Sequence, residues 1–223
     1  SNNTTLTTYA KIKYLKVVND PLRKTMGSDP NCGKEYGLIK DETSISEYAF
    51  QGYDEPYAFK GFIEYKTFYR KTATEKELLK PIIIIDGFDP GDKRQVLPCD
   101  YEPFKYRAGV DRSISEMMMY GDDKEKDLIK ELQNKGYDVI IVNQPTYYIM
   151  TTPPYQKVEK GTLGSKEIDG GGDYIERNGL NLVTLIKKIN TELATNGSTE
   201  KLVIVGPSMG GQISRYALAY MEK

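Results

Sequence analysis

KLVIVGPSMGGQISRYALAYMEK, at residues 201–223, is the stretch that predicts the fold of this chain. Its LVIV segment, at 202–205, is short, wholly apolar and mostly β-branched, which is typical of a strand covered on both faces in a parallel sheet. A helix is predicted from Gln212 to Lys223, because apolar residues there recur at spacings of one, three and four and so share one face. The stretch therefore predicts a strand, a glycine-flanked serine and a helix in immediate succession.

The turn between this strand and this helix carries Ser208 between Gly206 and Gly210. Strand, G-x-S-x-G and helix, in that order, form the context in which a serine nucleophile is raised on a strained turn. Glycines are required there because larger residues would clash with the adjoining strand and helix. A glycine-rich turn with an incidental serine is the alternative for the five letters alone, and the flanking strand and helix favour the nucleophile.

GPSMGGQISRYAL, at residues 206–218, resembles the nucleophile elbow and following helix of α/β-hydrolase-fold serine esterases and lipases, in which GxSMGGxxxRYAL-type sequences recur. The resemblance implies a three-layer α/β sandwich with a mostly parallel central sheet and two antiparallel strands at its N-terminal end. It also implies cleavage of carboxylic esters through an acyl-enzyme on Ser208. The choice among ester, peptide and thioester substrates stays open.

The same resemblance implies an oxyanion hole made by two backbone amides. One is the amide of Met209, directly after the nucleophile, and the other comes from the loop DGFDPG at 86–91. Phe88 is the expected donor, since the resembled enzymes commonly carry His-Gly-x there and use the amide of x. This chain has Asp86 in place of that histidine, which a backbone donor tolerates. The alternative is a turn that merely needs glycine and proline.

The whole chain, 1–223, is expected to be a single but incomplete α/β-hydrolase domain. Residues 1–80 are expected to supply N-terminal strands and irregular cover, and 81–223 a βαβ core that ends with the nucleophile helix. Strands are predicted at Tyr9–Val18, Phe59–Arg70, Pro81–Ile85 and Tyr137–Val142. Apolar residues do not recur at a regular spacing over residues 21–57, so this segment is expected to be irregular, with one short strand near 47–50.

Two helices are predicted between the later strands. Asp122 and Asp123 are expected to cap a helix that runs through Lys135 and buries Leu128, Ile129 and Leu132. Asp173 is expected to be the N-cap of a second helix at 174–194, because a long apolar-periodic stretch follows it.

Residues 143–172, between the YDVIIV strand and the second helix, are expected to form a long loop at the carboxyl end of the sheet, where such sheets place their sites. Tyr147, Tyr148 and Tyr155 make this segment aromatic, so part of a substrate pocket above Ser208 is one interpretation. A loop lying on its own hydrophobic patch is the other. The triple glycine at 170–172 lacks the Lys-Ser/Thr of a phosphate-binding loop.

Charge and composition argue against several other functional classes of protein. The 31 basic and 32 acidic residues leave a net charge of −1, so no nucleic acid or anionic membrane is expected as a partner. No apolar run approaches the roughly 20 residues of a membrane span. No metal or cofactor motif occurs, and none is expected. Cys32 and Cys99 lie in loop-like surroundings, where a disulfide and two free thiols are both open, with a slight preference for an exported protein.

The residues that would complete a serine relay are missing from this sequence. It contains no histidine, and Glu222, the only acid after Ser208, stands 14 residues along a helix, or about 20 Å away. The chain is therefore expected to be an inactive fragment. Its strand at 202–205 is expected to pair with a missing C-terminal half or with a second chain. A non-catalytic binding protein that keeps Ser208 as a relic is the rival hypothesis.

Overall fold

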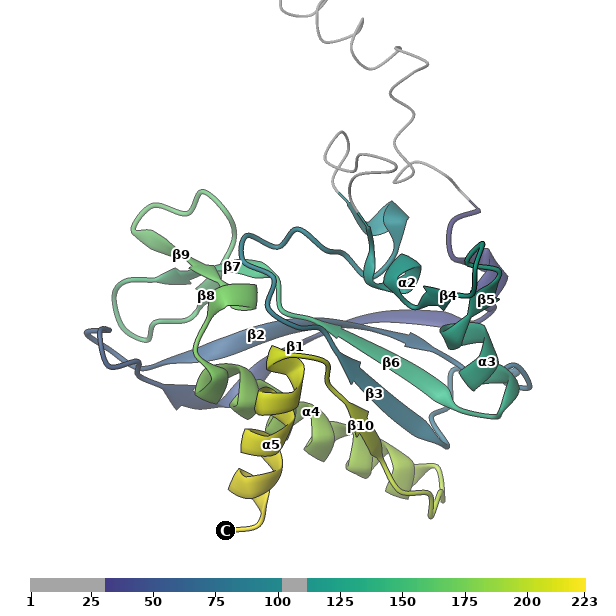
Figure 1. Ribbon diagram of the computed structural model, residues 1–223. Helices are drawn as coiled ribbons and strands as arrows, with labels where there is room; N and C mark the ends of the chain where they lie inside the picture. The colour runs from purple at the N-terminus through teal and green to yellow at the C-terminus, as the bar shows by residue number, and fades with distance from the viewer. Residues whose placement is uncertain (1–30, 102–111) are drawn as a thin grey trace, which may run out of the picture.

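The computed structural model describes residues 31–101 and 112–223. A five-stranded sheet in the order β1-β2-β6-β3-β10 lies at its centre (Figure 1). The strands are β1 (Ile39–Phe50), β2 (Phe59–Phe68), β6 (Asp138–Asn143), β3 (Pro81–Ile85) and β10 (Val203–Val205). Strands β6, β3 and β10 are parallel, whereas β1 and β2 are antiparallel to each other and β2 is antiparallel to β6. The predicted sheet, mostly parallel with two antiparallel N-terminal strands, is confirmed.

Strand β3 forms the middle of the parallel part. Ile83 pairs with Ile140 of β6 on one side and with Ile204 of β10 on the other. Every residue of β3 and of β6 is buried. This burial explains the apolar runs PIIII of β3 and VIIV within β6, since a parallel strand is covered on both faces.

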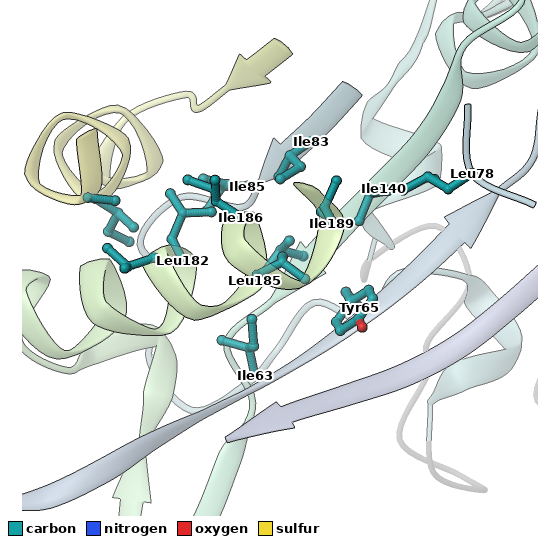
Figure 2. Close-up of a cluster of buried hydrophobic side chains, with 14 of the residues drawn as sticks. Ile63, Tyr65, Leu78, Ile83, Ile85, Ile140, Leu182, Leu185, Ile186 and Ile189 are labelled. Carbon is teal, nitrogen blue, oxygen red and sulfur yellow. The ribbon is translucent and has the colours of Figure 1, made fainter. Parts of the chain in front are cut away.

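Helices cover the two faces of the sheet, so the fold has three layers (Figure 1). The long helices α4 (Ile175–Thr195) and α5 (Met209–Met221) lie on one face, and α2 (Ile114–Met117) and α3 (Leu128–Asn134) lie on the other. Figure 2 shows Ile83, Ile85 and Ile140 directed toward Leu185 and Ile189 of α4. Their neighbours along the strands, such as Ile82, Ile84 and Ile141, pack on the opposite face with Ile129 of α3.

The expectation of irregular cover over residues 21–57 is wrong for residues 39–46, and the short strand expected near 47–50 is the end of a longer one. The 12-residue strand β1 occupies 39–50, and its register with β2 shifts between Ile45 and Ala49. Its sequence IKDETSISEYAF is polar because most of its residues are exposed or only half-buried, so the apolar signal of a strand is weak. The strand predicted at Tyr9–Val18 lies outside the described residues, and β1 and β2 form the antiparallel pair.

The helix predicted from Asp122 begins later. Residues 119–120 (β4, Met119–Tyr120) and 126–127 (β5, Lys126–Asp127) pair as a short antiparallel ladder. Helix α3 starts after Asp127, whose carboxylate accepts hydrogen bonds from the amides of Ile129 and Lys130. Ile129 is fully buried as expected, but Leu128 is exposed because it is the first helical residue and faces away from the sheet.

The long loop expected at 143–172 is instead a second, three-stranded antiparallel sheet in the order β8-β7-β9. Its strands are β8 (Lys157–Val158), β7 (Thr146–Met150) and β9 (Ser165–Asp169), followed by a 3-10 turn, η5 (Gly170–Gly172). Asp173 is not the N-cap of α4: Tyr174 holds that position, and Asp173 binds the Tyr174 amide and the side chain of Arg177.

Cys32 and Cys99 form a disulfide, with their Cα atoms 6.0 Å apart. The structure therefore selects the disulfide over two free thiols, the alternatives that the sequence left open. The bond ties the segment before η3 (Lys34–Tyr36) to η4 (Pro98–Asp100). We expect its reduction to lower the free energy of unfolding by about 4 kcal/mol, because it closes a 67-residue separation in the unfolded chain. Urea unfolding with and without reductant measures the difference, and equal midpoints would contradict this role.

Candidate active site

Ser208 lies on the turn between β10 and α5, with φ 52° and ψ −124°. Residues with a Cβ atom rarely adopt this backbone region, and holding one there costs about 1–3 kcal/mol. Such strain persists only where the surrounding structure imposes it, and it concentrates at functional sites. The backbone at Ser208 is therefore the strained strand-to-helix turn that the sequence predicts, and the nucleophilic role of the side chain remains a prediction.

Two glycines make this turn sterically possible. A Cβ atom added to Gly206 would lie 2.3 Å from the carbonyl carbon and oxygen of Gly210. One added to Gly210 would lie 2.7 Å from the carbonyl oxygen of Ile85. Both contacts are with backbone atoms, which cannot move aside as a side chain can. The first turn of α5 consequently packs directly on β10 and on the end of β3.

We expect Gly206→Ala to destabilise the chain by about 3 kcal/mol, because the new methyl group overlaps the backbone of Gly210. Gly172→Ala is the control, since the nearest neighbour of its added Cβ is a side-chain atom, a carboxylate oxygen of Asp169 at 3.1 Å, rather than backbone. Urea unfolding of both variants measures the difference. Equal and small losses for the two would show that the turn at Ser208 can relax.

The loop after β3 lies against Ser208. A Cβ atom added to Gly87 would be 3.3 Å from the Ser208 Cβ atom and 3.9 Å from its Oγ. The absence of a side chain at this position therefore leaves space directly beside the hydroxyl. The structure thus brings together three of the predicted segments: the turn with Ser208, the start of α5, and the loop that holds Phe88.

Hydrogen bonding leaves the amides of the two predicted donors without acceptors. In the β3 loop, the Gly87 amide donates to the Asp86 carboxylate (2.8 Å) and the Asp89 amide to the Gly171 carbonyl (3.1 Å). Among the described residues, no acceptor is found for the Phe88 amide between them. The side chain of Phe88 is 58% exposed, so it does not anchor the loop.

The first turn of α5 shows the same pattern. The Gly210 amide donates to the Pro207 carbonyl (2.9 Å) and the Gly211 amide to the Ser208 carbonyl (3.1 Å). No acceptor is found for the Met209 amide in the described part of the chain, as expected for the first residue of a helix. Amides of this kind at a helix N-terminus favour negative charge, so an oxyanion is a suitable ligand.

Side chains that the sequence analysis did not select hold the β3 loop. Arg94 contacts Asp86, Phe88 and Asp89, and the two carboxylates are almost completely buried. Burial raises the pKa of Asp89, while the Arg94 amide and guanidinium oppose that rise. The only signal in the sequence was a lone arginine five residues after the second aspartate of the loop, and this spacing has no general meaning.

The predicted tyrosine pocket does not form around Ser208. Tyr147 and Tyr148 line a cavity of about 380 Å³ together with Gly91 and Asp92, and Ser208 is not among its lining residues. Tyr147 is 3% exposed and packs in a core cluster, and its burial raises the pKa of its hydroxyl well above the usual value.

Tyr155 lies apart from that cavity and stacks on Tyr57, with the two ring centroids 4.1 Å apart. Tyr155 and Tyr147 nevertheless pack in one core cluster with Phe59 and Phe62, and Tyr148 shares the cavity with Tyr147.

The described residues do not supply a base or an acid next to Ser208 that fits a serine relay. Histidine is absent from the sequence, and Glu222 is exposed at the C-cap of α5, the far end of the helix. Among the described residues, no cluster of side chains is suited to a metal ion. The described helices include none that is long and apolar enough to cross a bilayer.

Comparisons with known proteins gave similarities only to solved structures. No protein-family model matches the chain, and no curated protein matches it. The solved structures to which the chain is similar include two described as α/β-hydrolases, two esterases and a lipase.

Three of these structures illustrate the extent of the likeness. A serine hydrolase without a lid from Xanthomonas campestris shares 11% identity at a TM-score of 0.35, over 81% of this chain and 57% of its own. Homoserine O-acetyltransferase from Bacillus anthracis shares 17% identity at a TM-score of 0.39, over 80% of this chain and 42% of its own. Peroxisomal α/β-hydrolase Lpx1 from Saccharomyces cerevisiae shares 13% identity at a TM-score of 0.37, over 83% of this chain and 41% of its own. The chain thus spans about half the length of the structures it matches.

Proposed function

We propose that this chain is the N-terminal part of a serine hydrolase that cleaves carboxylic esters. The observation that carries the proposal is Ser208 on its strained turn, with the loop residue Gly87 beside it. The amides of Phe88 and Met209, in the two adjoining segments, have no acceptor among the described residues. A nucleophilic hydroxyl and donors to the oxyanion are parts that acyl transfer needs from the enzyme.

In the proposed reaction, the Ser208 Oγ attacks the ester carbonyl carbon while its proton passes to a base. The tetrahedral oxyanion accepts hydrogen bonds from the Phe88 and Met209 amides, and each such donor contributes roughly 10²–10³ in rate. The alcohol leaves with the proton, and water then hydrolyses the acyl-enzyme on Ser208. The base and its orienting acid are supplied by polypeptide outside the sequence described here, so this chain alone is expected to be inactive.

The edge of the sheet at β10 supports the proposal that more polypeptide packs there. In the described part of the chain β10 pairs only with β3, and Val203 and Val205 are 40% and 44% exposed. We propose that polypeptide following Lys223 pairs with this edge, because a strand after a β–α unit returns by a right-handed crossover beside the first strand.

Sedimentation tests this pairing. The chain alone is expected to self-associate, and the double variant Val203→Lys/Val205→Lys is expected to be monomeric. A protein extended beyond Lys223 should not self-associate through this edge. Self-association that persists in the extended protein would identify a second chain as the partner, and a monomeric chain with no affinity for the downstream segment would contradict the pairing.

A fluorophosphonate reagent tests the function. Ser208 is expected to be labelled in a protein extended beyond Lys223 and to react at least about 10³-fold more slowly in this chain, because the base is absent. Rapid labelling of this chain would show that it contains a base of its own. A well-folded extended protein that is neither labelled nor active on esters would favour the rival, a non-catalytic binding protein on a hydrolase scaffold.

We also propose that the protein is exported, on the support of the Cys32–Cys99 disulfide, since such bonds persist mainly in oxidising compartments. Alkylation of free thiols in freshly lysed cells of the source organism tests this. Cysteines that are fully alkylated without reductant would contradict export.

A further inference from the structure

The side chain of Arg94 binds the loop that holds Phe88. Its Nε atom donates to the Asp86 carboxylate at 2.9 Å, and its Nη2 atom donates to the Phe88 carbonyl oxygen at 2.8 Å. The backbone amide of Arg94 donates to the Asp89 carboxylate at 2.8 Å. Arg94 is therefore bonded to Asp86, two residues before the predicted oxyanion donor, to the donor residue Phe88 itself, and to Asp89, which follows it.

These bonds determine which way the peptide planes of the loop face. The peptide between Phe88 and Asp89 is held at both ends, since its oxygen accepts from Arg94 and its amide donates to the Gly171 carbonyl at 3.1 Å. The Gly87 amide is held by the other oxygen of Asp86, the carboxylate that Arg94 also binds. The peptide plane that carries the Phe88 amide therefore lies between two held groups, which restricts the rotations open to it.

A second contact holds the same loop from the opposite side. A Cβ atom added to Gly171 would lie 2.1 Å from the Asp89 carbonyl oxygen, so the two backbones touch. The Gly91 amide donates to the Asp169 carboxylate at 2.9 Å, and Asn178 of α4 binds the Gly170 carbonyl at 2.9 Å. The loop is thus clamped between the η5 turn, which α4 holds, and the guanidinium of Arg94.

The chemistry of the contact requires an arginine. A planar guanidinium presents several donors in fixed directions, so one group can bind a carboxylate and a carbonyl oxygen at once. A lysine ammonium is a single point charge on a flexible stem, and it would satisfy the Asp86 charge without fixing the Phe88 carbonyl. The lysine variant therefore separates the role of charge from that of orientation.

We propose that Arg94 is a positioning residue of the proposed hydrolase, which acts through Asp86 and the Phe88 carbonyl to aim the Phe88 amide at the oxyanion formed next to Ser208. The proposal rests on the proposed function. It predicts that Arg94 affects the transition state more than substrate binding, because the oxyanion exists only there.

Steady-state ester hydrolysis by the protein extended beyond Lys223 tests the catalytic part. We expect Arg94→Lys and Arg94→Gln to lower kcat by about 10- to 100-fold with KM changed less than about threefold. Arg112→Gln, at an exposed arginine of the described chain, is the matched control and should retain kcat. A wild-type kcat in Arg94→Lys, or losses in both variants that merely follow the loss of folded protein, would overturn the proposal.

Amide hydrogen exchange of this chain tests the structural part without any activity. In Arg94→Gln the Asp89 amide should exchange at least about tenfold faster, while amides of β3 and α4 keep their protection. Unchanged exchange at Asp89, or a uniform increase over the whole chain, would overturn the proposal. If the wild-type extended protein shows no hydrolysis, the proposed function fails, and the exchange result still decides whether Arg94 holds the loop.

Discussion

Replacing Ser208 with alanine is expected to lower the esterase kcat of the extended protein by roughly 10⁵-fold and to abolish fluorophosphonate labelling. The physical reason is that the attacking oxygen is removed, and donors that stabilise an oxyanion have no covalent intermediate to act on. Ser214→Ala is the matched control, because that serine lies one and a half turns further along α5 and its hydroxyl donates to the Gly210 carbonyl at 2.7 Å. Labelling that survives in Ser208→Ala but not in Ser214→Ala would contradict the assignment of Ser208 as the nucleophile.

A stability measurement on the same residue needs no activity. Ser208 has φ 52° and ψ −124°, a region that glycine adopts without a Cβ clash. Ser208→Gly is therefore expected to raise the free energy of unfolding of this chain by about 1 kcal/mol, although it removes the proposed nucleophile. A clear loss of stability would show that the turn is not strained, and would remove the structural argument for the site.

Replacing Arg177 with methionine is expected to destabilise the chain by about 3–5 kcal/mol at neutral pH. The side chain is 0% exposed, pairs with Asp173 and Glu55, and lies 3.6 Å above the ring of Phe59. Its removal leaves two buried carboxylates without their cation, and methionine replaces only the packing. Lys187→Met is the control, because the Lys187–Glu47 pair is exposed on both sides and should contribute little to stability.

The stability deficit of Arg177→Met, that is, its loss in free energy of unfolding, should depend on pH. Burial raises the pKa of Asp173 and the Arg177 charge opposes that rise, so removing Arg177 raises this pKa further. A carboxyl group whose folded-state pKa is raised stabilises the fold at low pH, and that contribution is lost as pH rises through the folded-state pKa. The deficit should therefore shrink as pH falls from 7 toward 4. Urea unfolding at several pH values measures this, and a constant deficit would show that Asp173 is not the group left uncompensated.

The parallel part of the sheet could be predicted from the sequence because its signals are local. PIIII and the VIIV run of β6 are apolar without interruption and buried, as is typical of strands covered on both faces. LVIV shows the same pattern, although Val203 and Val205 are exposed at the edge of the described sheet. The glycines around Ser208 could be interpreted for the same reason, since the residues that they contact lie close along the chain or on the next strand.

Three features escaped prediction because residue spacing alone gives a weak signal for each of them. Strand β1 is polar, and its place is set by pairing with β2 and packing on α4. The second sheet, β8-β7-β9, forms from a segment whose apolar residues alternate only over five positions. Tyr147 and Tyr155 of that segment pack in one core cluster, and Tyr147 and Tyr148 line one cavity, which their spacing along the chain could not show.

The amino-acid sequence by itself determined the strand–serine–helix unit, the buried strands beside it and the absence of a histidine, since these follow from residue type and short spacing. Only the tertiary structure decided that Arg94 binds Asp86 and Phe88, that Arg177 is buried between Asp173 and Glu55, and that Cys32 and Cys99 are joined. The physical reason is the short distance over which these contacts form. Hydrogen bonds and ion pairs are made between groups that the folded backbone brings within about 3 Å, and residue spacing along the chain does not encode that approach.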